Sequence, residues 1–182
     1  MKHLVLLMLV SVVILAGCDP FNDQFTLALN MEPITKTYGL NPGGTSFTNP
    51  ATPYNLNDYV DEAYIDDITG GGIYDIGVRL SPAHTGRTVS GQVTLSYGGN
   101  TATVSYSGTW DQLTTERTVV RDPTLVTIDD PTAFNNLVNA VFTQNPLPTI
   151  TLSDNGSSSQ TITSGDSLTV SIYGQAATAI KL

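Results

Sequence analysis

The chain has 182 residues, a formal net charge of −9 and a single cysteine. With only seven lysines and arginines it lacks the clustered basic side chains that nucleic-acid binding requires. One cysteine excludes an internal disulfide, and a hydrophobic content of 40% argues against intrinsic disorder. The chain must therefore fold around an apolar core without covalent staples.

The N-terminus has the pattern of a secretory signal peptide. It begins with Lys2 and His3, and residues 4–15 are almost wholly apolar. This run is too short to cross a bilayer as a helix, which takes about 20 apolar residues. We therefore expect export, not a transmembrane span.

The apolar run ends at Leu15-Ala16-Gly17-Cys18, which resembles the lipobox of bacterial lipoproteins. The resemblance implies cleavage before Cys18 and acylation of its sulfur and its new amino group. It divides the chain into a removed signal peptide (1–17), a lipidated tether (18–24) and one folded domain (25–182). The alternatives are an ordinary secretory signal that leaves an idle thiol and a buried segment of the fold.

Lipidation would make the bilayer the first partner of the protein. Two or three acyl chains hold a protein on a membrane far more durably than one, whose binding is marginal. The mature chain would keep six basic and 16 acidic residues, a net charge of −10, so the acyl chains must supply the adhesion. The predicted location is the bacterial cell envelope, and Asp19 indicates the inner membrane in enteric-type bacteria. The outer membrane stays open for other lineages.

The first half of the domain predicts strands around one short helix. Alternating apolar residues predict a strand over 25–31, and turn-forming residues predict an irregular surface loop over 38–53. Residues 55–68 predict a helix capped by Asn55 or Asn57. The three glycines at 70–72 should end that helix, and a strand should follow over 73–80.

The second half gives the clearest local signals. Residues 93–97 and 102–106 alternate apolar with Thr or Ser around a turn at 98–100, which predicts a β-hairpin with one buried face. Strand character continues over 117–128, with a break at Asp122-Pro123. Asp130 and Pro131 begin a helix that ends at Asn145-Pro146. Three more strands are expected over 148–154, 159–163 and 167–182, separated by turns at 154–156 and 164–166.

These elements favour an all-β fold: an antiparallel, immunoglobulin-like β-sandwich with one or two short inserted helices. A small closed β-barrel is the alternative.

No catalytic set is evident in the sequence. Residues 165–168, Gly-Asp-Ser-Leu, resemble the nucleophile motif of GDSL hydrolases, which would make Ser167 the nucleophile. That family places a histidine after the serine and near the C-terminus, and none follows Ser167 here, so the catalytic role is not carried over. His84 is expected to be a solvated loop imidazole.

Metal and glycan sites receive weak support. Asp66, Asp67 and Asp75 are the candidates for a structural calcium ion, although they do not match a calcium-loop spacing. We expect no cofactor. Trp110 could form a stacking platform for a sugar or a partner protein with four tyrosines, Tyr54, Tyr59, Tyr64 and Tyr74, whereas the preferred interpretation places Trp110 in the core of the sandwich.

The sequence therefore favours a lipid-anchored, non-enzymatic binding or structural domain of the cell envelope, whose partner would be an envelope protein or a glycan. The alternatives are a carbohydrate-binding module that uses Trp110 and an envelope hydrolase that uses Ser167.

Overall fold

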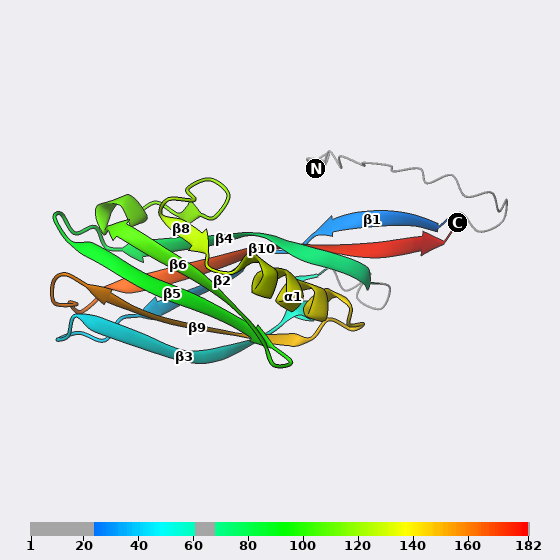
Figure 1. Ribbon diagram of the computed structural model, residues 1–182, viewed down its shortest axis with the longest axis horizontal. Helices are drawn as coiled ribbons and strands as arrows, with labels where there is room; N and C mark the ends of the chain where they lie inside the picture. Colours follow the sequence, from blue (N-terminus) through cyan, green and yellow to red (C-terminus); the bar gives the residue numbers. More distant parts are fainter. Residues whose placement is uncertain (1–23, 61–67, 182) are drawn as a thin grey trace, which may run out of the picture.

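The computed structural model describes residues 24–60 and 68–181. Two five-stranded antiparallel sheets pack face to face (Figure 1). Sheet A consists of β1 (Gln24–Asn30), β2 (Ile34–Gly39), β4 (Ile68–Ser81), β7 (Arg117–Thr118) and β10 (Ser167–Lys181). Sheet B consists of β3 (Ser46–Asn55), β5 (Thr88–Tyr97), β6 (Asn100–Thr109), β8 (Val126–Ile128) and β9 (Thr149–Ser158). The predicted all-β sandwich is confirmed, and no strand ladder joins the two sheets within the described residues.

The core lies between the sheets because side chains alternate between the two faces of each strand. Leu168 and Val170 of β10 and Val93 and Leu95 of sheet B belong to one buried apolar cluster, and all four are fully buried. Burying an aliphatic side chain of this size contributes about 1.5–3 kcal/mol. Since no disulfide can form, this apolar burial is the main source of stability.

β10 organises sheet A along its whole length. Its first part pairs with β2, from Ser167↔Gly39 to Ile172↔Ile34, and its last part pairs with β1 on the same edge. β4 pairs along the opposite edge. In Figure 1, β1 and the end of β10 extend beyond sheet B, so this part of sheet A is a projecting ribbon.

The predicted late helix is confirmed as α1 (Pro131–Phe142), which closes the open side of the sandwich between β6 and β4. Asp130 caps it, since its Oδ1 accepts hydrogen bonds from the backbone N–H groups of Thr132 (2.8 Å) and Ala133 (3.1 Å). Within the described ranges, no helix has the length and apolar character needed to cross a membrane.

The predicted hairpin is also confirmed. β5 and β6 pair from Thr88↔Thr109 to Tyr97↔Asn100, which leaves Gly98 and Gly99 as a two-residue loop. Both glycines have positive φ angles, 57° and 84°, which is the conformation that a tight hairpin turn requires.

The predicted irregular loop over 38–53 is wrong for most of its length. β3 begins at Ser46 and passes through Pro50 and Pro53. It is an edge strand that pairs only with β9, and the register shifts between Asn49 and Thr52. Proline is tolerated at an edge and at a bulge because neither position needs its missing N–H.

The helix predicted over 55–68 is replaced by a single 3-10 turn, η1 (Leu56–Tyr59), in its described part. Asn55 caps this turn by accepting a hydrogen bond from the backbone N–H of Asn57 (3.3 Å). Residues 61–67 lie outside the described residues. The glycines expected to precede a strand at 73 lie inside β4, which already begins at Ile68.

Gly71 shows why glycines occur within this strand. A Cβ atom there would collide with the Phe142 ring of α1 and with the carbonyl oxygen of Gln175 in β10. Glycine therefore allows a close approach of helix and strand.

Two further strand predictions fail in detail. The strand expected over 159–163 does not form; instead Ile162 exchanges backbone hydrogen bonds with the loop before β3, through Gly43 N–H (3.0 Å) and Gly44 carbonyl (2.7 Å). Over 117–128 only the short β7 and β8 are strands. The expected break at Asp122-Pro123 lies in the turn between them.

Candidate functional site

Some predicted site residues cannot be placed. Cys18, Asp19, Asp66 and Asp67 lie outside the described residues. Asp75, His84, Trp110 and Ser167 are described, and the last three lie in or beside one buried polar cluster.

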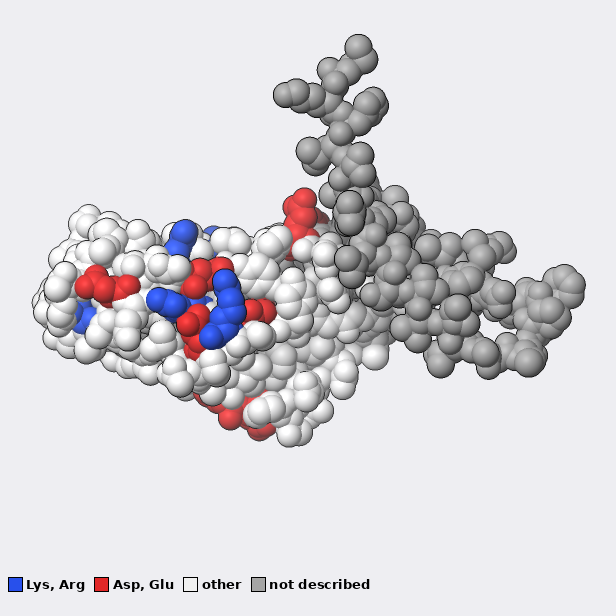
Figure 2. Space-filling view, turned by 90° about the horizontal axis from the view of Figure 1, so that it is seen from above, with Lys and Arg blue, Asp and Glu red and all other residues white. Residues whose placement is uncertain are grey.

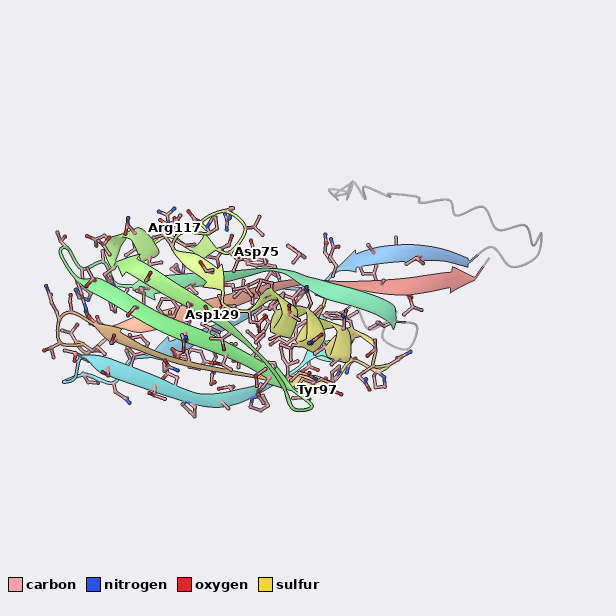
Figure 3. The ribbon with its side chains drawn as sticks, in the orientation of Figure 1. Asp75, Tyr97, Arg117 and Asp129 are labelled. Carbon is pink, nitrogen blue, oxygen red and sulfur yellow. The ribbon has the colours of Figure 1, made fainter. Side chains whose placement is uncertain are left out.

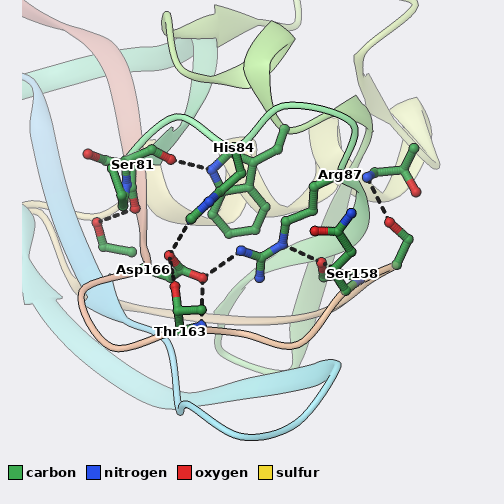
Figure 4. Close-up of polar contacts among 12 residues, drawn as sticks. Ser81, His84, Arg87, Ser158, Thr163 and Asp166 are labelled. Atoms are coloured by element: carbon green, nitrogen blue, oxygen red, sulfur yellow. Dashed lines mark hydrogen bonds and ion pairs between the residues drawn. The ribbon is translucent and has the colours of Figure 1, made fainter.

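This cluster brings together segments far apart in sequence (Figure 4). His84 and Arg87 belong to the connection between β4 and β5, and Trp110 follows β6. Ser158 ends β9, and Asp166 directly precedes β10. We call these five residues and Thr163 the Asp166 cluster.

The Asp166 carboxylate is the centre of the cluster and has no exposed surface. Its Oδ1 lies 2.7 Å from His84 Nε2, and its Oδ2 lies 2.7 Å from Arg87 Nη1. Thr163 donates its backbone N–H to Oδ2 and its hydroxyl to Oδ1, each at 2.9 Å. Burial alone would raise the pKa of Asp166, but these hydrogen bonds outweigh it and lower the pKa to about 2.

Arg87 joins the carboxylate to the aromatic part of the cluster. Its guanidinium carbon lies 3.8 Å from the centre of the Trp110 ring, and its Nε donates to Ser158 Oγ at 2.6 Å. Trp110 donates its Nε1–H to the Pro82 carbonyl at 2.6 Å. Arg87 Nη2 is buried without a hydrogen-bond partner. The contacts tie the β4–β5 connection to β6, β9 and β10 at one end of the sandwich.

The cluster superficially resembles a serine-histidine-aspartate triad, but the contacts differ. A serine nucleophile needs a base within hydrogen-bond reach. His84 Nε2 is held by Asp166, whereas Ser167 Oγ donates to the Ser81 carbonyl at 3.4 Å. Ser158 Oγ accepts from Arg87 instead. The geometry is that of a buried ion-pair network.

The structure corrects two expectations here. His84 is not a solvated loop imidazole: its side chain is 27% exposed and bonded to Asp166. Trp110 has no exposed surface, so the prediction of a sugar-stacking platform at this residue is wrong. Arg87 covers one face of the indole, His84 meets it edge-on, and the residue is fully buried, so no ring face is open to a ligand.

Asp75 is engaged in a structural role. Its Oδ1 accepts hydrogen bonds from the backbone N–H groups of Ile76 (2.9 Å) and Val120 (3.2 Å), which hold the β7–β8 loop against β4. Within residues 24–60 and 68–181, no three His, Cys, Asp or Glu side chains are grouped closely enough to hold a metal ion.

A second buried carboxylate, Asp154, has a raised pKa, whereas the pKa of Asp166 is lowered. The turn expected at 154–156 is wrong, because these residues lie within β9 and Asp154 points into the core, 2% exposed. Asn49 Nδ2 reaches its two oxygens at 2.6 and 3.2 Å. Burial raises the pKa of Asp154 to about 6, against the smaller lowering effect of Asn49.

The outer face of sheet B carries uncharged polar side chains, and we call it the hydroxyl face. It surrounds a shallow hollow of about 630 Å³ and includes Ser90, Gln92, Ser105, Ser107, Asn155 and Ser157. At its rim, Asp129 Oδ2 accepts hydrogen bonds from Gln92 (3.2 Å) and Ser105 (2.9 Å); Figure 3 shows Asp129 beside β6. Apart from the Asp129 carboxylate at the rim, the face offers uncharged hydrogen-bonding groups.

Charges gather elsewhere on the molecule. Figure 2 shows acidic and basic side chains side by side on the face seen from above, where the β7–β8 loop lies. Two ion pairs belong to this region: Arg117 with Asp122 (3.2 Å) and Arg121 with Glu116 (3.6 Å). The signs are mixed, so this face presents no basic stripe for a polyanion.

Comparison with known proteins adds little. No protein-family model matches the sequence, and no curated protein matches it. A solved structure titled Desmodium yellow mottle tymovirus is similar over 99% of this chain and 94% of its own, with 10% identity and a TM-score of 0.33. A structure of infectious bursal disease virus, Gx strain, is similar over 93% of this chain and 37% of its own, with 16% identity and a TM-score of 0.29. Similarities this low support no inference about function.

Sequence reasoning missed Arg87 and Asp154 as buried charges. The sequence pattern predicts a loop around His84 that includes Arg87, and a turn that begins at Asp154. A usable signal was the alternation that places Ile150, Leu152 and Asp154 on one face of a strand.

Proposed function

We propose that the protein is a lipid-anchored protein of the bacterial cell envelope whose sandwich is a non-enzymatic binding or structural domain. The observation that carries the proposal is Leu15-Ala16-Gly17-Cys18 directly after an apolar run. β1 begins at Gln24, six residues after Cys18, so lipids on Cys18 would keep the domain within about 20 Å of the bilayer.

The contacts of the described polar groups support the non-enzymatic part of the proposal. The Asp166 carboxylate is saturated by Thr163, His84 and Arg87, and the Ser167 hydroxyl donates to the Ser81 backbone carbonyl. Asp154 is bonded to Asn49 inside the core. Each group therefore has a structural partner in place of a substrate.

The hydroxyl face is the surface that we propose contacts another envelope component. Apart from Asp129 at its rim it is uncharged, and its amide and hydroxyl groups can donate and accept hydrogen bonds. These properties suit a polar partner that the net negative charge of the chain does not repel.

The anchor is tested on the native protein. Mass spectrometry of the purified protein should show an N-terminal Cys18 carrying acyl chains, and radiolabelled palmitate should be incorporated. Cys18→Ser should abolish both and move the protein from the detergent phase to the aqueous phase. An unmodified N-terminus in wild-type protein would overturn the proposal.

The non-enzymatic role and the contact surface need separate tests. Esterase turnover that is lost in Ser167→Ala would contradict the non-enzymatic assignment. For the surface, crosslinked cells should yield a reproducible partner with the wild type, and much less with Ser90→Arg/Ser157→Arg. Thr35→Arg, at an exposed position on β2, is the matched control and should retain the partner. Equal capture by all three would exclude the hydroxyl face as the contact surface.

A further inference from the structure

Tyr74 is exposed in a way that core packing does not explain. Its side chain is 53% exposed, and that of Val120 is 66% exposed; they are the exposed large apolar side chains of the described residues. Seven partly buried apolar residues pack against the core, and Tyr74 is not among them. The amide of Val120, in the β7–β8 loop, donates a hydrogen bond to Asp75, the residue next to Tyr74, so this loop lies against the same part of β4.

A β-bulge sets the position of Tyr74. β10 pairs Tyr173 with Asp75 and then Gly174 with Ile73, so Tyr74 is the extra residue on β4. A bulge re-aims the side chain that it carries. The Tyr74 ring lies 6.3 Å from the Tyr173 ring, tilted by 37°, and Tyr173 is held by a hydrogen bond from its hydroxyl to Glu116 Oε2 (2.7 Å).

A hollow of about 280 Å³ adjoins Tyr74 on the projecting ribbon. Its volume is close to the lower end of small-molecule sites, about 300 Å³. β1, β4 and β10 line it mainly with small residues, including Ala28, Gly72 and Ala177, and Gln175 adds an amide. Gln175 Nε2 donates to Asn30 Oδ1 at 2.9 Å, so a pair of amides lies beside the hollow.

We propose that this surface binds a neutral pyranose of a polysaccharide, with Tyr74 as the stacking residue. We call it the Tyr74 surface: Ala28, Gly72, Tyr74, Tyr173, Gln175 and Ala177. The negative face of an aromatic ring attracts the C–H groups on one face of a sugar ring. The small residues let the sugar lie flat, and the Gln175 and Asn30 amides can bond its hydroxyls.

The charges near the site favour a neutral sugar over an anionic one. Asp75 is the chain neighbour of Tyr74, and Glu116 contacts Tyr173, where Arg121 partly neutralises it. With a net charge of −9 on the whole chain, an anionic polysaccharide would be repelled. A neutral sugar has no such penalty.

The dimensions favour a sugar over a protein partner. Stable protein interfaces bury about 800 Å² on each partner around a cluster of large anchors. The Tyr74 surface offers a single protruding aromatic beside a small hollow. It therefore suits a ligand of one or a few rings. The inference goes beyond the membrane anchoring proposed above and does not depend on Cys18.

The test uses the full chain in a detergent that has no sugar headgroup. Binding of neutral oligosaccharides (cellohexaose, maltoheptaose and chitohexaose) and of the anionic oligogalacturonate is measured by calorimetry. We expect at least one neutral oligosaccharide to bind and oligogalacturonate to fail. Tyr74→Ala should weaken binding about tenfold or more, as for an aromatic hot spot, and Tyr74→Phe should retain it.

Two more variants test whether a loss of binding is specific to the Tyr74 surface. Ala28→Leu fills the hollow while Tyr74 stays, and it should also weaken binding. Tyr97→Ala removes a tyrosine at the β5–β6 turn, away from Asp75 (Figure 3), and should bind normally. Near-ultraviolet circular dichroism of Trp110 confirms that each variant is folded.

Three results would overturn the inference. They are no binding of any neutral oligosaccharide, binding that Tyr74→Ala and Ala28→Leu leave unchanged, and self-association that Tyr74→Ala abolishes in the absence of sugar. The last result would make the surface an interface between copies of the chain. None of these outcomes affects acylation of Cys18, so failure here is distinguishable from failure of the anchor.

Discussion

Arg87 lies between Trp110 and Asp166 inside the protein: its guanidinium carbon is 3.8 Å from the centre of the indole ring, and its Nη1 is 2.7 Å from the carboxylate. The Arg87 side chain is 1% exposed. A buried charge of this kind depends on its partner, because desolvation costs several kcal/mol when no opposite charge compensates it.

Replacing Arg87 should therefore destabilise the fold strongly. Arg87→Met leaves the Asp166 charge buried without its cation, and we expect a loss of about 3–5 kcal/mol in the free energy of unfolding. The measurement is urea denaturation followed by the fluorescence of Trp110, the single tryptophan.

Arg117→Met is the matched control. Arg117 pairs with Asp122 at 3.2 Å, and its side chain is 33% exposed, so the loss of this pair should cost about 1 kcal/mol or less. An equal loss of unfolding free energy in the two variants would mean that the buried Arg87–Asp166 pair matters no more to stability than the partly exposed Arg117–Asp122 pair.

Acid should weaken the Asp166 cluster at low pH. The pKa of Asp166 is about 2 in the folded protein and about 3.8 when unperturbed, so its contribution is present above pH 4 and is lost as the pH falls towards 2. The contribution at neutral pH is about 2 kcal/mol. Asp166→Asn should be less stable at pH 7 and should show a flatter stability profile between pH 2 and 4. An unchanged acid slope would contradict this.

Asp154 should make stability depend on pH in the opposite direction. Its pKa is raised to about 6, so the protonated form is favoured in the folded state. Its stabilising contribution is complete below about pH 3.8 and is lost as the pH rises through 6, a change of about 2–3 kcal/mol.

Asp154→Asn keeps an oxygen for Asn49 and removes the buried charge. We expect this variant to be more stable than the wild type at pH 8, by about 1–2 kcal/mol, and similar at pH 4. Thermal unfolding at both pH values checks the prediction. A variant less stable than the wild type at pH 8 would show that the ionised form is the favoured one.

The sequence predicted those elements whose signals are local. The hairpin around Gly98-Gly99 and the helix that begins at Asp130-Pro131 depend on turn, cap and periodicity patterns within about 20 residues. Their boundaries were close to those observed. β3 was missed because Pro50 and Pro53 normally exclude a strand, and only its edge position in sheet B, a property of the assembled sheet, permits them.

The site residues were harder to predict, for the same reason. Whether Trp110 is exposed depends on Arg87, 23 positions earlier, and whether His84 is solvated depends on Asp166, 82 positions later. Tyr74 is exposed because a bulge interrupts the pairing of β4 with β10, which alternation of residue types does not reveal. Contacts with residues far away in the chain determine whether these side chains are exposed, and a single sequence does not show those contacts.

The helix cap gives a prediction with a neighbouring control. Asp130→Ala removes the acceptor for the backbone N–H groups of Thr132 and Ala133, and it should cost about 1 kcal/mol. Asp129→Ala removes only surface hydrogen bonds to Gln92 and Ser105 and should cost less. Denaturant midpoints of the two variants are compared, and a larger shift for Asp129→Ala would exclude the capping role.

Gly91 should not be replaceable without loss of stability, because it leaves room for a side chain from the adjacent strand. A Cβ atom at Gly91 would collide with the Tyr106 hydroxyl and lie 2.5 Å from both the Tyr106 ring carbon Cζ and the Asn155 carbonyl oxygen. Gly91→Ala should therefore cost about 1–3 kcal/mol as an overpacked site. Gly44→Ala, where the nearest atom is 3.7 Å away, should be close to neutral.

A double variant identifies the cause of the Gly91 effect. The Tyr106 hydroxyl is buried and has no hydrogen-bond partner, so Tyr106→Phe removes the colliding oxygen without breaking a bond. Gly91→Ala/Tyr106→Phe should recover part of the stability that Gly91→Ala loses, which appears as a coupling energy in a double-mutant cycle. If the two effects simply add, the collision with the hydroxyl is not the cause, and the contacts with the Asn155 carbonyl oxygen and the Tyr106 ring carbon Cζ, which phenylalanine keeps, must account for the loss.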